Sequence, residues 1–312
     1  MLNWLVVGVG DITTKRVIPA ILAEPRSRLV GIVTRDARKA GAFGVPGWSE
    51  LKDGLQGADA VYVATPVFLH APQTILCLRA GKHVLCEKPM GMNYAEACSM
   101  EQASRETGRL LGIAYYRRLY PKVDRARALI ESGAIGLPVF AEATSHDWFN
   151  PVGGHRSWLA DPKRAGGGPL YDIASHRIDL MNYLFGAPRK ACGYLSTLAQ
   201  EVPVEDNASV LIDYENGVRG FVDVRWHSRV ARDEFRIRGT EGEIDLSPLN
   251  GDSLVFPGGR ESIAAPANLH YPCVHDFVCA LLDGTPLRSS GASAMMTDWV
   301  TEQVMGINGP SR

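Results

Sequence analysis

The sequence predicts two domains of different fold class: an α/β domain on a parallel sheet over residues 1–118, and an α+β domain with a large, mostly antiparallel open sheet over residues 119–312. Three observations lead to this prediction. A chain of 312 residues is too long for one ordinary compact core. Its first part alternates short apolar runs with helical segments, as in βαβ units. Its last part holds alternating segments and an Asn-Gly hairpin signal, which is typical of antiparallel strands.

The composition excludes several classes of partner. Hydrophobic residues make up 46% of the chain, charged residues 21%, and the formal net charge is -1, so nothing favours nucleic acid or an anionic membrane. No apolar run approaches membrane-spanning length, and the first residues lack a basic start and a cleavage site, which predicts a cytoplasmic protein. The six cysteines form no Cys-x-x-Cys pair and most lie in apolar segments, so we expect reduced, buried thiols and assign no metal site. The expected ligands are small molecules.

A glycine turn follows the first expected strand, the apolar run at residues 2–7. Gly8 permits a tight turn, and Gly10 lets the backbone approach a pyrophosphate at the N-terminus of a helix expected over residues 14–24. Thr13 stands where the third glycine of the dinucleotide fingerprint would be, so the match is partial and a plain strand-turn-helix remains the alternative. The cofactor-binding candidates of this turn are Gly8, Gly10, Asp11 and Ile12.

The second expected strand, residues 29–34, ends without the acid that would bind the ribose 2'-hydroxyl of NAD. Thr34 and Arg35 stand there instead, and Arg38 adds charge. A hydroxyl and a guanidinium can accept a 2'-phosphate, which favours NADP. NAD remains the alternative, because an arginine can also stack on adenine.

Further candidates for cofactor and substrate binding follow the third and fourth expected strands. Thr65 and Pro66 follow the run at residues 60–63, and His70 opens the next helix, where it either caps the helix or touches the cofactor. The run at residues 83–86 leads into Glu87-Lys88-Pro89, and Pro89 cannot extend a ladder, so Lys88 emerges at the carboxyl end of the sheet. There it can face the cofactor and a substrate oxygen, with Glu87 holding its direction. A solvated Glu-Lys pair is the alternative.

The last strand of this half delivers a segment that leaves the sheet and is expected to cross to the second domain. Tyr116 and Arg118 lie in it, where a polyol or sugar substrate could meet them; a solvated linker explains them nearly as well.

A glycine-rich loop, from Gly153-Gly154 through Gly166-Gly167-Gly168, precedes a helix expected over residues 170–185. Asp172, His176 and Asp179 have spacings of four and three, which places them on one face. We interpret them as an acid-base histidine oriented by aspartate, the alternative being a structural polar network.

The strand at residues 207–214 has apolar residues on both faces. Val210, Ile212 and Tyr214 alternate with Leu211 and Asp213, so the helix can cover only one face. Burial of the other face in a partner predicts a homodimer or homotetramer formed through the C-terminal sheet.

The chain resembles the glucose-fructose oxidoreductase/inositol dehydrogenase (Gfo/Idh/MocA) family along essentially its whole length. The residues that carry the resemblance are Gly8-Val9-Gly10, Thr65-Pro66 with His70, Glu87-Lys88-Pro89, and Gly166-Gly167-Gly168-Pro169-Leu170-Tyr171-Asp172 with His176 and Asp179. The resemblance implies an N-terminal Rossmann domain that binds NAD or NADP, a catalytic pair of Lys88 and His176, and substrate binding by Asp172. Two departures are Val67, where asparagine is frequent, and Leu159, which follows the substrate candidate Trp158 where many members have arginine.

Together these features predict an NAD(P)-dependent dehydrogenase or reductase acting on CH-OH groups of a carbohydrate-like substrate. The catalytic candidates are Lys88, His176 and Asp172, and the substrate-binding candidates are Lys88, Tyr116, Arg118, Trp158, Asp172 and His176. Two other functions stay open at this point. One is a non-catalytic NAD(P)-binding regulator, and the other is a glycosidase that oxidises and re-reduces its sugar on tightly held NAD.

Overall fold

The computed structural model describes residues 1–154 and 156–307, and the chain divides into two compact units. The first unit combines residues 1–116 with residues 266–295, and the second begins at Arg117. The expected boundary after residue 118 therefore lies two residues beyond the observed one. The expectation of an uninterrupted second domain is wrong, because the chain returns to the first unit.

That return has an apolar cause. Helix α8 (Tyr271–Asp283) buries Cys273, Val274, Phe277 and Val278 in the first unit. The centroid of the Phe277 ring lies 5.4 Å from that of Trp4, which is a residue of the first strand. The buried stripe of α8 thus packs on the first sheet.

The first unit has a six-stranded sheet in which all paired strands run parallel, as predicted. Its strands, in the order β3-β2-β1-β4-β5-β6, are β1 (Leu2–Val7), β2 (Ser27–Val33), β3 (Gly47–Trp48), β4 (Ala60–Val63), β5 (His83–Cys86) and β6 (Leu111–Ile113). The order reverses between β1 and β4. Ligands of such sheets bind at this switch point, beyond the carboxyl ends of the strands.

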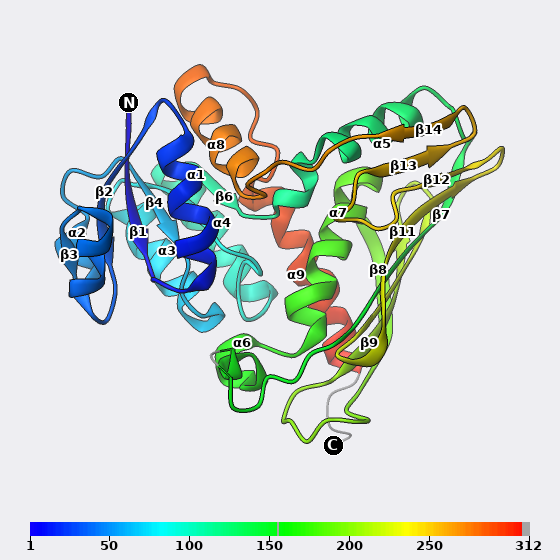
Figure 1. Cartoon of the computed structure of the whole chain (residues 1–312), viewed down its shortest axis with the longest axis horizontal. Helices are drawn as coiled ribbons and strands as arrows, with labels where there is room; N and C mark the ends of the chain where they lie inside the picture. Colours follow the sequence, from blue (N-terminus) through cyan, green and yellow to red (C-terminus); the bar gives the residue numbers. More distant parts are fainter. Residues whose placement is uncertain (155, 308–312) are drawn as a thin grey trace. The chain divides into compact units, whose positions relative to one another are not determined.

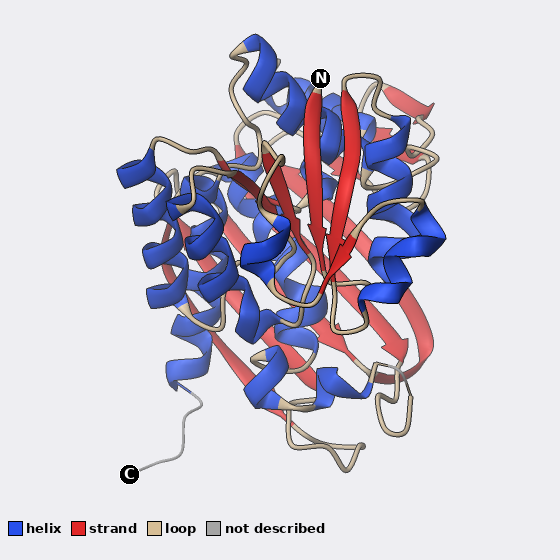
Figure 2. Cartoon of the chain, turned by 90° about the vertical axis from the view of Figure 1, so that its left-hand side faces the viewer, coloured by secondary structure: helices blue, strands red, loops and turns tan. Residues whose placement is uncertain are grey.

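Helices flank both faces of this sheet (Figures 1 and 2). The helical elements of residues 1–116 are η1 (Thr13–Val17), α1 (Ile18–Ala23), η2 (Ala37–Phe43), α2 (Leu51–Gly54), η3 (Val67–Leu69), α3 (His70–Arg79) and α4 (Tyr94–Thr107). Two side chains cap the start of α4: that of the N-cap residue Asn93 accepts from Glu96 N at 2.9 Å, and that of Glu96 accepts at 2.9 Å from the nitrogen of Met92, one residue before the N-cap.

The second unit has an eight-stranded sheet in the order β14-β13-β12-β11-β7-β10-β9-β8, and only β7 and β10 pair in parallel among the described strands. The strands are β7 (Pro138–Trp148), β8 (Pro188–Ser196), β9 (Asn207–Tyr214), β10 (Arg219–Arg225), β11 (His227–Gly239), β12 (Glu243–Asp245), β13 (Ser253–Phe256) and β14 (Gly259–Ser262). The predicted Asn-Gly hairpin joins β9 to β10, with Gly217 at φ 88°. The large, mostly antiparallel sheet is confirmed.

One helix, α7 (Ser175–Phe185), covers the inner face of this sheet (Figure 1). A Cβ at Gly220 of β10 would lie 3.0 Å from the sulfur of Met181, so the glycine permits the close approach of helix and sheet. The other helical elements of the chain are η4 (Tyr116–Leu119), α5 (Pro121–Glu131), η5 (Ser157–Ala160), α6 (Pro162–Ala165), η6 (Leu170–Ala174) and α9 (Gly291–Ile307). Within the ranges that the structure describes, no helix is both long and apolar enough to cross a membrane.

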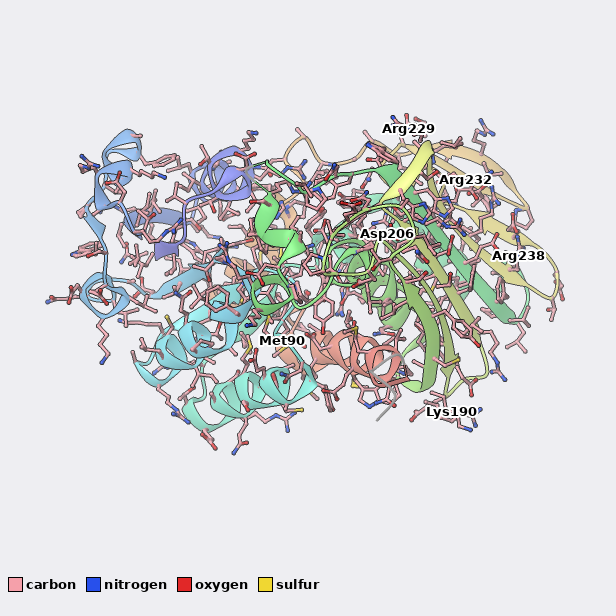
Figure 3. All side chains as sticks on the ribbon, turned by 90° about the horizontal axis from the view of Figure 1, so that it is seen from below. Met90, Lys190, Asp206, Arg229, Arg232 and Arg238 are labelled. Carbon is pink, nitrogen blue, oxygen red and sulfur yellow. The ribbon has the colours of Figure 1, made fainter. Side chains whose placement is uncertain are left out.

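The two faces of the second sheet differ as the alternation predicts. Ile212 is 1% exposed on the inner face, whereas its neighbour Leu211 is 50% exposed on the outer face. Figure 3 shows Arg232, Arg238 and Lys190 on the side of the sheet away from α7. The outer face therefore carries both charged and apolar side chains.

Candidate active site

The glycine turn after β1 is tight at its first glycine and open beside its second. Gly8 has φ +94°, and a Cβ there would lie 2.5 Å from the carbonyl oxygen of Ala64, which follows β4. A Cβ at Gly10 would meet nothing within 4 Å. Gly8 is thus required by the turn itself, whereas Gly10 leaves open space beside the backbone at the switch point.

The helix after this turn begins in π form, at Thr13–Val17. Thr13, in the place of the third fingerprint glycine, is fully buried, while Asp11 and Ile12 are exposed at the rim of the turn. Asp11 pairs with Lys15 at 3.2 Å. The turn therefore tolerates a threonine at its third position, with an altered helical start.

The two arginines after β2 differ in their partners: among the residues described, Arg38 is paired with an aspartate, whereas Arg35 is not. Arg38 forms a two-point contact with Asp36, with Nε at 2.8 Å and Nη2 at 3.1 Å, and this hydrogen bonding lowers the pKa of Asp36. The side chain of Asp36 also caps η2, where it accepts from Arg38 N. Arg35 is exposed and forms no ion pair with the residues described. Thr34 is half-buried beside it.

His70 lies at the junction of two loops at the sheet edge, and it is 1% exposed. Its Nδ1 is 2.8 Å from the carbonyl oxygen of Pro89, and its Nε2 is 2.8 Å from that of Thr65. Burial lowers the pKa of His70, and the neutral ring donates to one of these two carbonyl oxygens. This position between two loops differs from the predicted cofactor contact. The histidine instead joins the Thr65-Pro66 loop to the loop that follows Lys88.

The side chain of Glu87 lies in a buried network behind Lys88. Glu87 is 8% exposed, and its Oε1 accepts from Tyr62 Oη at 2.8 Å and lies 3.2 Å from Nε2 of His270. Burial alone would raise the pKa of Glu87, but the hydrogen bonds from His270 and Tyr62 hold it below its usual value. The carboxylate also accepts from the backbone nitrogen of Lys88 at 3.3 Å, so it fixes the lysine through the main chain.

Sequence reasoning missed His270, which no local spacing connects to Glu87, 183 residues away. The ring of Tyr116 lies against that of His270, with centroids 4.6 Å apart. Tyr116 is 8% exposed, so its ring supports the network from the other side. Lys88 itself is half-buried at the end of this arrangement.

In the second unit, each glycine of the triple-glycine loop has a steric reason. A Cβ at Gly166 or Gly167 would collide with the ring of Tyr171, and one at Gly168 would collide with the carbonyl oxygen of Glu205. The buried side chain of Glu205 accepts from Gly168 N at 2.9 Å and from Leu170 N at 3.0 Å. A carboxylate thus caps the helix from a distant loop.

The helix that follows starts with a second π turn, η6, and holds two of the predicted catalytic residues. Asp172 is half-buried and accepts from Arg156 Nη2 at 3.0 Å. Arg156 lies over the ring of Phe149, 4.5 Å from its centroid. His176, one turn later, is 6% exposed. Although an arginine is missing at position 159, Arg156 brings a guanidinium to Asp172; sequence reasoning overlooked it.

Arg118 and Asp179 form a buried ion pair, with Arg118 Nε 2.7 Å from Asp179 Oδ2 and a second contact through Nη2. Both residues are 1% exposed. Burial raises the pKa of Asp179, and the guanidinium opposes that rise. The predicted role of Arg118 in substrate binding does not fit this geometry, because its guanidinium anchors α7. Asp179 is likewise engaged by Arg118 and Thr297.

Trp158, the remaining substrate candidate, is half-buried in η5. It packs on a small apolar cluster that contains Leu159 and Trp226. Leu159 is therefore a core residue here, which accounts for its apolar character where arginine is frequent.

Comparisons with known proteins agree with both units. Residues 2–115 match the oxidoreductase family with an NAD-binding Rossmann fold, and residues 123–245 match the GFO/IDH/MocA C-terminal domain. The chain is 31% identical over 300 residues to 1,5-anhydro-D-fructose reductase of Ensifer adhaerens, covering 90% of this chain and 88% of the relative. It is 30% identical over 279 residues to trans-1,2-dihydrobenzene-1,2-diol dehydrogenase of Mus musculus, covering 85% and 80%.

A solved structure of levoglucosan dehydrogenase in complex with NADH superposes with a TM-score of 0.88 at 26% identity, covering 98% of this chain and 96% of the other. Fold, motifs and relatives define the class as an NAD(P)-dependent dehydrogenase or reductase. The chain belongs to the Gfo/Idh/MocA family of oxidoreductases.

Proposed function

We propose that this enzyme transfers a hydride between a nicotinamide cofactor and a carbinol carbon of a sugar, polyol or related diol. The observation that carries the proposal is the placement of Lys88 at the carboxyl end of β5, held by the buried network around Glu87. The sugar and diol substrates in the names of the two curated relatives support this substrate class.

The residues around the switch point fit a dinucleotide, because a Cβ at Gly10 would occupy space that is otherwise open. When bound, the nicotinamide supplies or accepts the hydride. The residues that would hold the cofactor are Gly8, Gly10, Asp11, Ile12, Thr34, Arg35, Thr65, Pro66, Glu87 and Lys88. The NADH complex of levoglucosan dehydrogenase supports this assignment.

The chain's own groups handle the proton and the charge. His176 acts as the general acid-base at the substrate oxygen, and Asp172 binds the substrate next to it. Lys88 stabilises negative charge on the same oxygen. Glu205 and Arg118 do not touch substrate in this proposal. They hold the helical segment that carries Asp172 and His176, Glu205 at its N-terminus and Arg118 through Asp179, near its middle.

Cofactor choice follows from the end of β2, where NADP is preferred. Arg35 meets the 2'-phosphate with Thr34, while Arg38 is engaged with Asp36. Comparing Michaelis constants for NADP and NAD tests this preference, and Arg35→Ala is expected to weaken NADP about tenfold while leaving NAD nearly unchanged. A tenfold preference of the wild-type enzyme for NAD would refute it.

A titration tests cofactor binding without any substrate. Gly10→Val fills the open space beside the backbone, so we expect it to weaken dinucleotide binding at least tenfold by calorimetry. Gly306→Val is the matched control, because a Cβ there also meets nothing within 4 Å and Gly306 lies outside the first unit. Equal binding by both variants and the wild type would count against the assigned binding site.

A screen of sugars, inositols and aromatic diols with both cofactors then identifies the substrate through the absorbance of the reduced nicotinamide.

We also propose that the outer face of the second sheet forms a homodimer or homotetramer. Leu211 pairs with Phe221 on one side and Cys192 on the other, so these residues form a row across β10, β9 and β8. Tyr194, on the same strand as Cys192, is 81% exposed. Burial of such a row in a second copy stabilises an oligomer. A strictly monomeric mass by light scattering at micromolar concentration would contradict this.

A further inference from the structure

Helix α8 carries a histidine and a cysteine one turn apart, and the histidine contacts a carboxylate at the end of α1. The sulfur of Cys279 lies 3.5 Å from Nε2 of His275, and Nδ1 of His275 lies 2.7 Å from Oε2 of Glu24. The three side chains thus form a chain of contacts like that of a catalytic triad. In such a triad the histidine is the base that activates the thiol, and the carboxylate orients the histidine. All three belong to the first unit.

A guanidinium completes this group. Nη2 of Arg26 donates to the sulfur of Cys279 at 3.0 Å, while Nη1 of Arg26 contacts both oxygens of Asp283, at 2.9 and 2.8 Å. Asp283 therefore holds the arginine in place, and the arginine places positive charge beside the sulfur. This positive charge lies where negative charge develops on the sulfur as the thiol proton leaves.

Glu24 is suited to orient the histidine. Its side chain is only 1% exposed, and burial alone would raise its pKa; the hydrogen bonds from His275 and Arg26 bring the pKa below the usual value. An ionised Glu24 accepts a hydrogen bond from Nδ1–H of His275, which leaves the lone pair of Nε2 directed at the sulfur. This tautomer is the one that can accept the thiol proton.

The group lies away from the cofactor edge and is accessible. Arg26 immediately precedes β2, so it marks the amino end of the sheet, whereas the glycine turn follows the carboxyl end of β1. The side chain of His275 is 49% exposed, and Cys279 is partly exposed. The hydride-transfer residues make no use of this group, and a small reagent can reach it.

We propose that Cys279 is a nucleophilic thiol that undergoes thiol-disulfide exchange with small disulfides, with His275 as its base. The thiol proton passes to Nε2 of His275, and the thiolate attacks one sulfur of the disulfide. A new disulfide bond forms to Cys279 as the old one breaks with its electron pair. The departing thiolate then takes the proton from His275. Cys279 thus becomes a mixed disulfide, and no further oxidant is needed.

The chain offers a matched comparison. Cys98 is also partly exposed, lies on helix α4 of the same unit, and has no hydrogen-bond or ion-pair partner among the described residues. Cys77 is buried, and burial raises its pKa to about 12, so its reaction reports opening of the fold. One sample therefore contains the test thiol, an exposure control and an unfolding control.

The experiment treats the full-length protein at neutral pH with oxidised glutathione, and separately with iodoacetamide, and follows each cysteine by peptide mass spectrometry. We expect Cys279 to react at least tenfold faster than Cys98. His275→Gln is expected to reduce the Cys279 rate about tenfold, to the level of Cys98, without changing the Cys98 rate.

Equal rates for Cys279 and Cys98 in the wild-type protein would overturn the proposal, as would an unchanged Cys279 rate in His275→Gln. If His275→Gln exposes Cys77, Glu24→Gln replaces it as the deciding variant, since that change keeps the shape of the side chain and removes its charge. A Cys279 rate in Glu24→Gln equal to that of the wild type would then overturn the proposal.

Discussion

Replacing His270 by phenylalanine removes one donor from the carboxylate of Glu87 and keeps an aromatic ring against Tyr116. In the wild type, Glu87 Oε1 has Nε2 of His270 at 3.2 Å and the hydroxyl of Tyr62 at 2.8 Å. After the change only Tyr62 remains at that oxygen. Because Glu87 is 8% exposed, water replaces the lost donor poorly.

The magnitude follows from the loss of a hydrogen bond to a buried charged group. We expect His270→Phe to lower the free energy of unfolding by about 1.5–3 kcal/mol at pH 7. The folded-state pKa of Glu87 lies below its usual 4.5, so its contribution to stability is present above pH 4.5 and is lost as the pH falls through the folded value. The pKa of Glu87 rises in the variant. The difference between the two proteins should therefore shrink on acidification.

Urea unfolding of both proteins at pH 7 and pH 4 measures these quantities. Tyr116→Leu is a control for ring packing, because it removes the ring that lies against His270 and leaves the hydrogen bond between His270 and Glu87. Less than about 0.3 kcal/mol between wild type and His270→Phe at pH 7 would refute the network, as would a difference that stays constant with pH.

Three further predictions concern the second unit. Asp206, labelled in Figure 3, accepts from the backbone nitrogens of three successive residues, 198–200, so Asp206→Asn should destabilise the protein by about 2–4 kcal/mol in urea unfolding; a value near zero would contradict this. Lys122, 2% exposed, donates to three carbonyl oxygens, each at 2.8 Å; Lys122→Met should lower the melting temperature by several degrees, and an unchanged melting temperature would show that these bonds contribute little. Arg118→Met leaves Asp179 buried without its cation and should cost about 3–5 kcal/mol of stability, part of which the double variant with Asp179→Asn recovers; no recovery would contradict the pairing.

Local patterns predicted the elements that depend on nearby residues. Short apolar runs identified five of the six parallel strands and missed β3, which has two residues. The start of α4 has a local signal of the same kind, because Asn93 and its partner Glu96 are three residues apart. The Asn-Gly turn at Gly217 identified the hairpin for the same reason. Each of these signals involves residues that are only a few positions apart in the sequence.

Contacts between distant segments were missed because periodicity carries no information about them. Glu205 binds Gly168 from 37 residues away, and His270 lies 183 residues from Glu87. The return of α8 to the first unit has the same cause. Arg118 shows a second limit: a charged residue after a strand has the same pattern whether it binds substrate or pairs in the core, and only its burial with Asp179 distinguishes the two.

The central claim is that Lys88 and His176 act together on one substrate oxygen. Turnover of Lys88→Ala, His176→Ala and the double variant, with the substrate that the screen identifies, tests it most directly. Each single change should lower kcat on the order of a hundredfold or more, and the double variant should be little worse than the poorer single variant. Near wild-type turnover in either single variant would contradict the claim. A double variant whose loss in kcat equals the product of the two single losses would also contradict it.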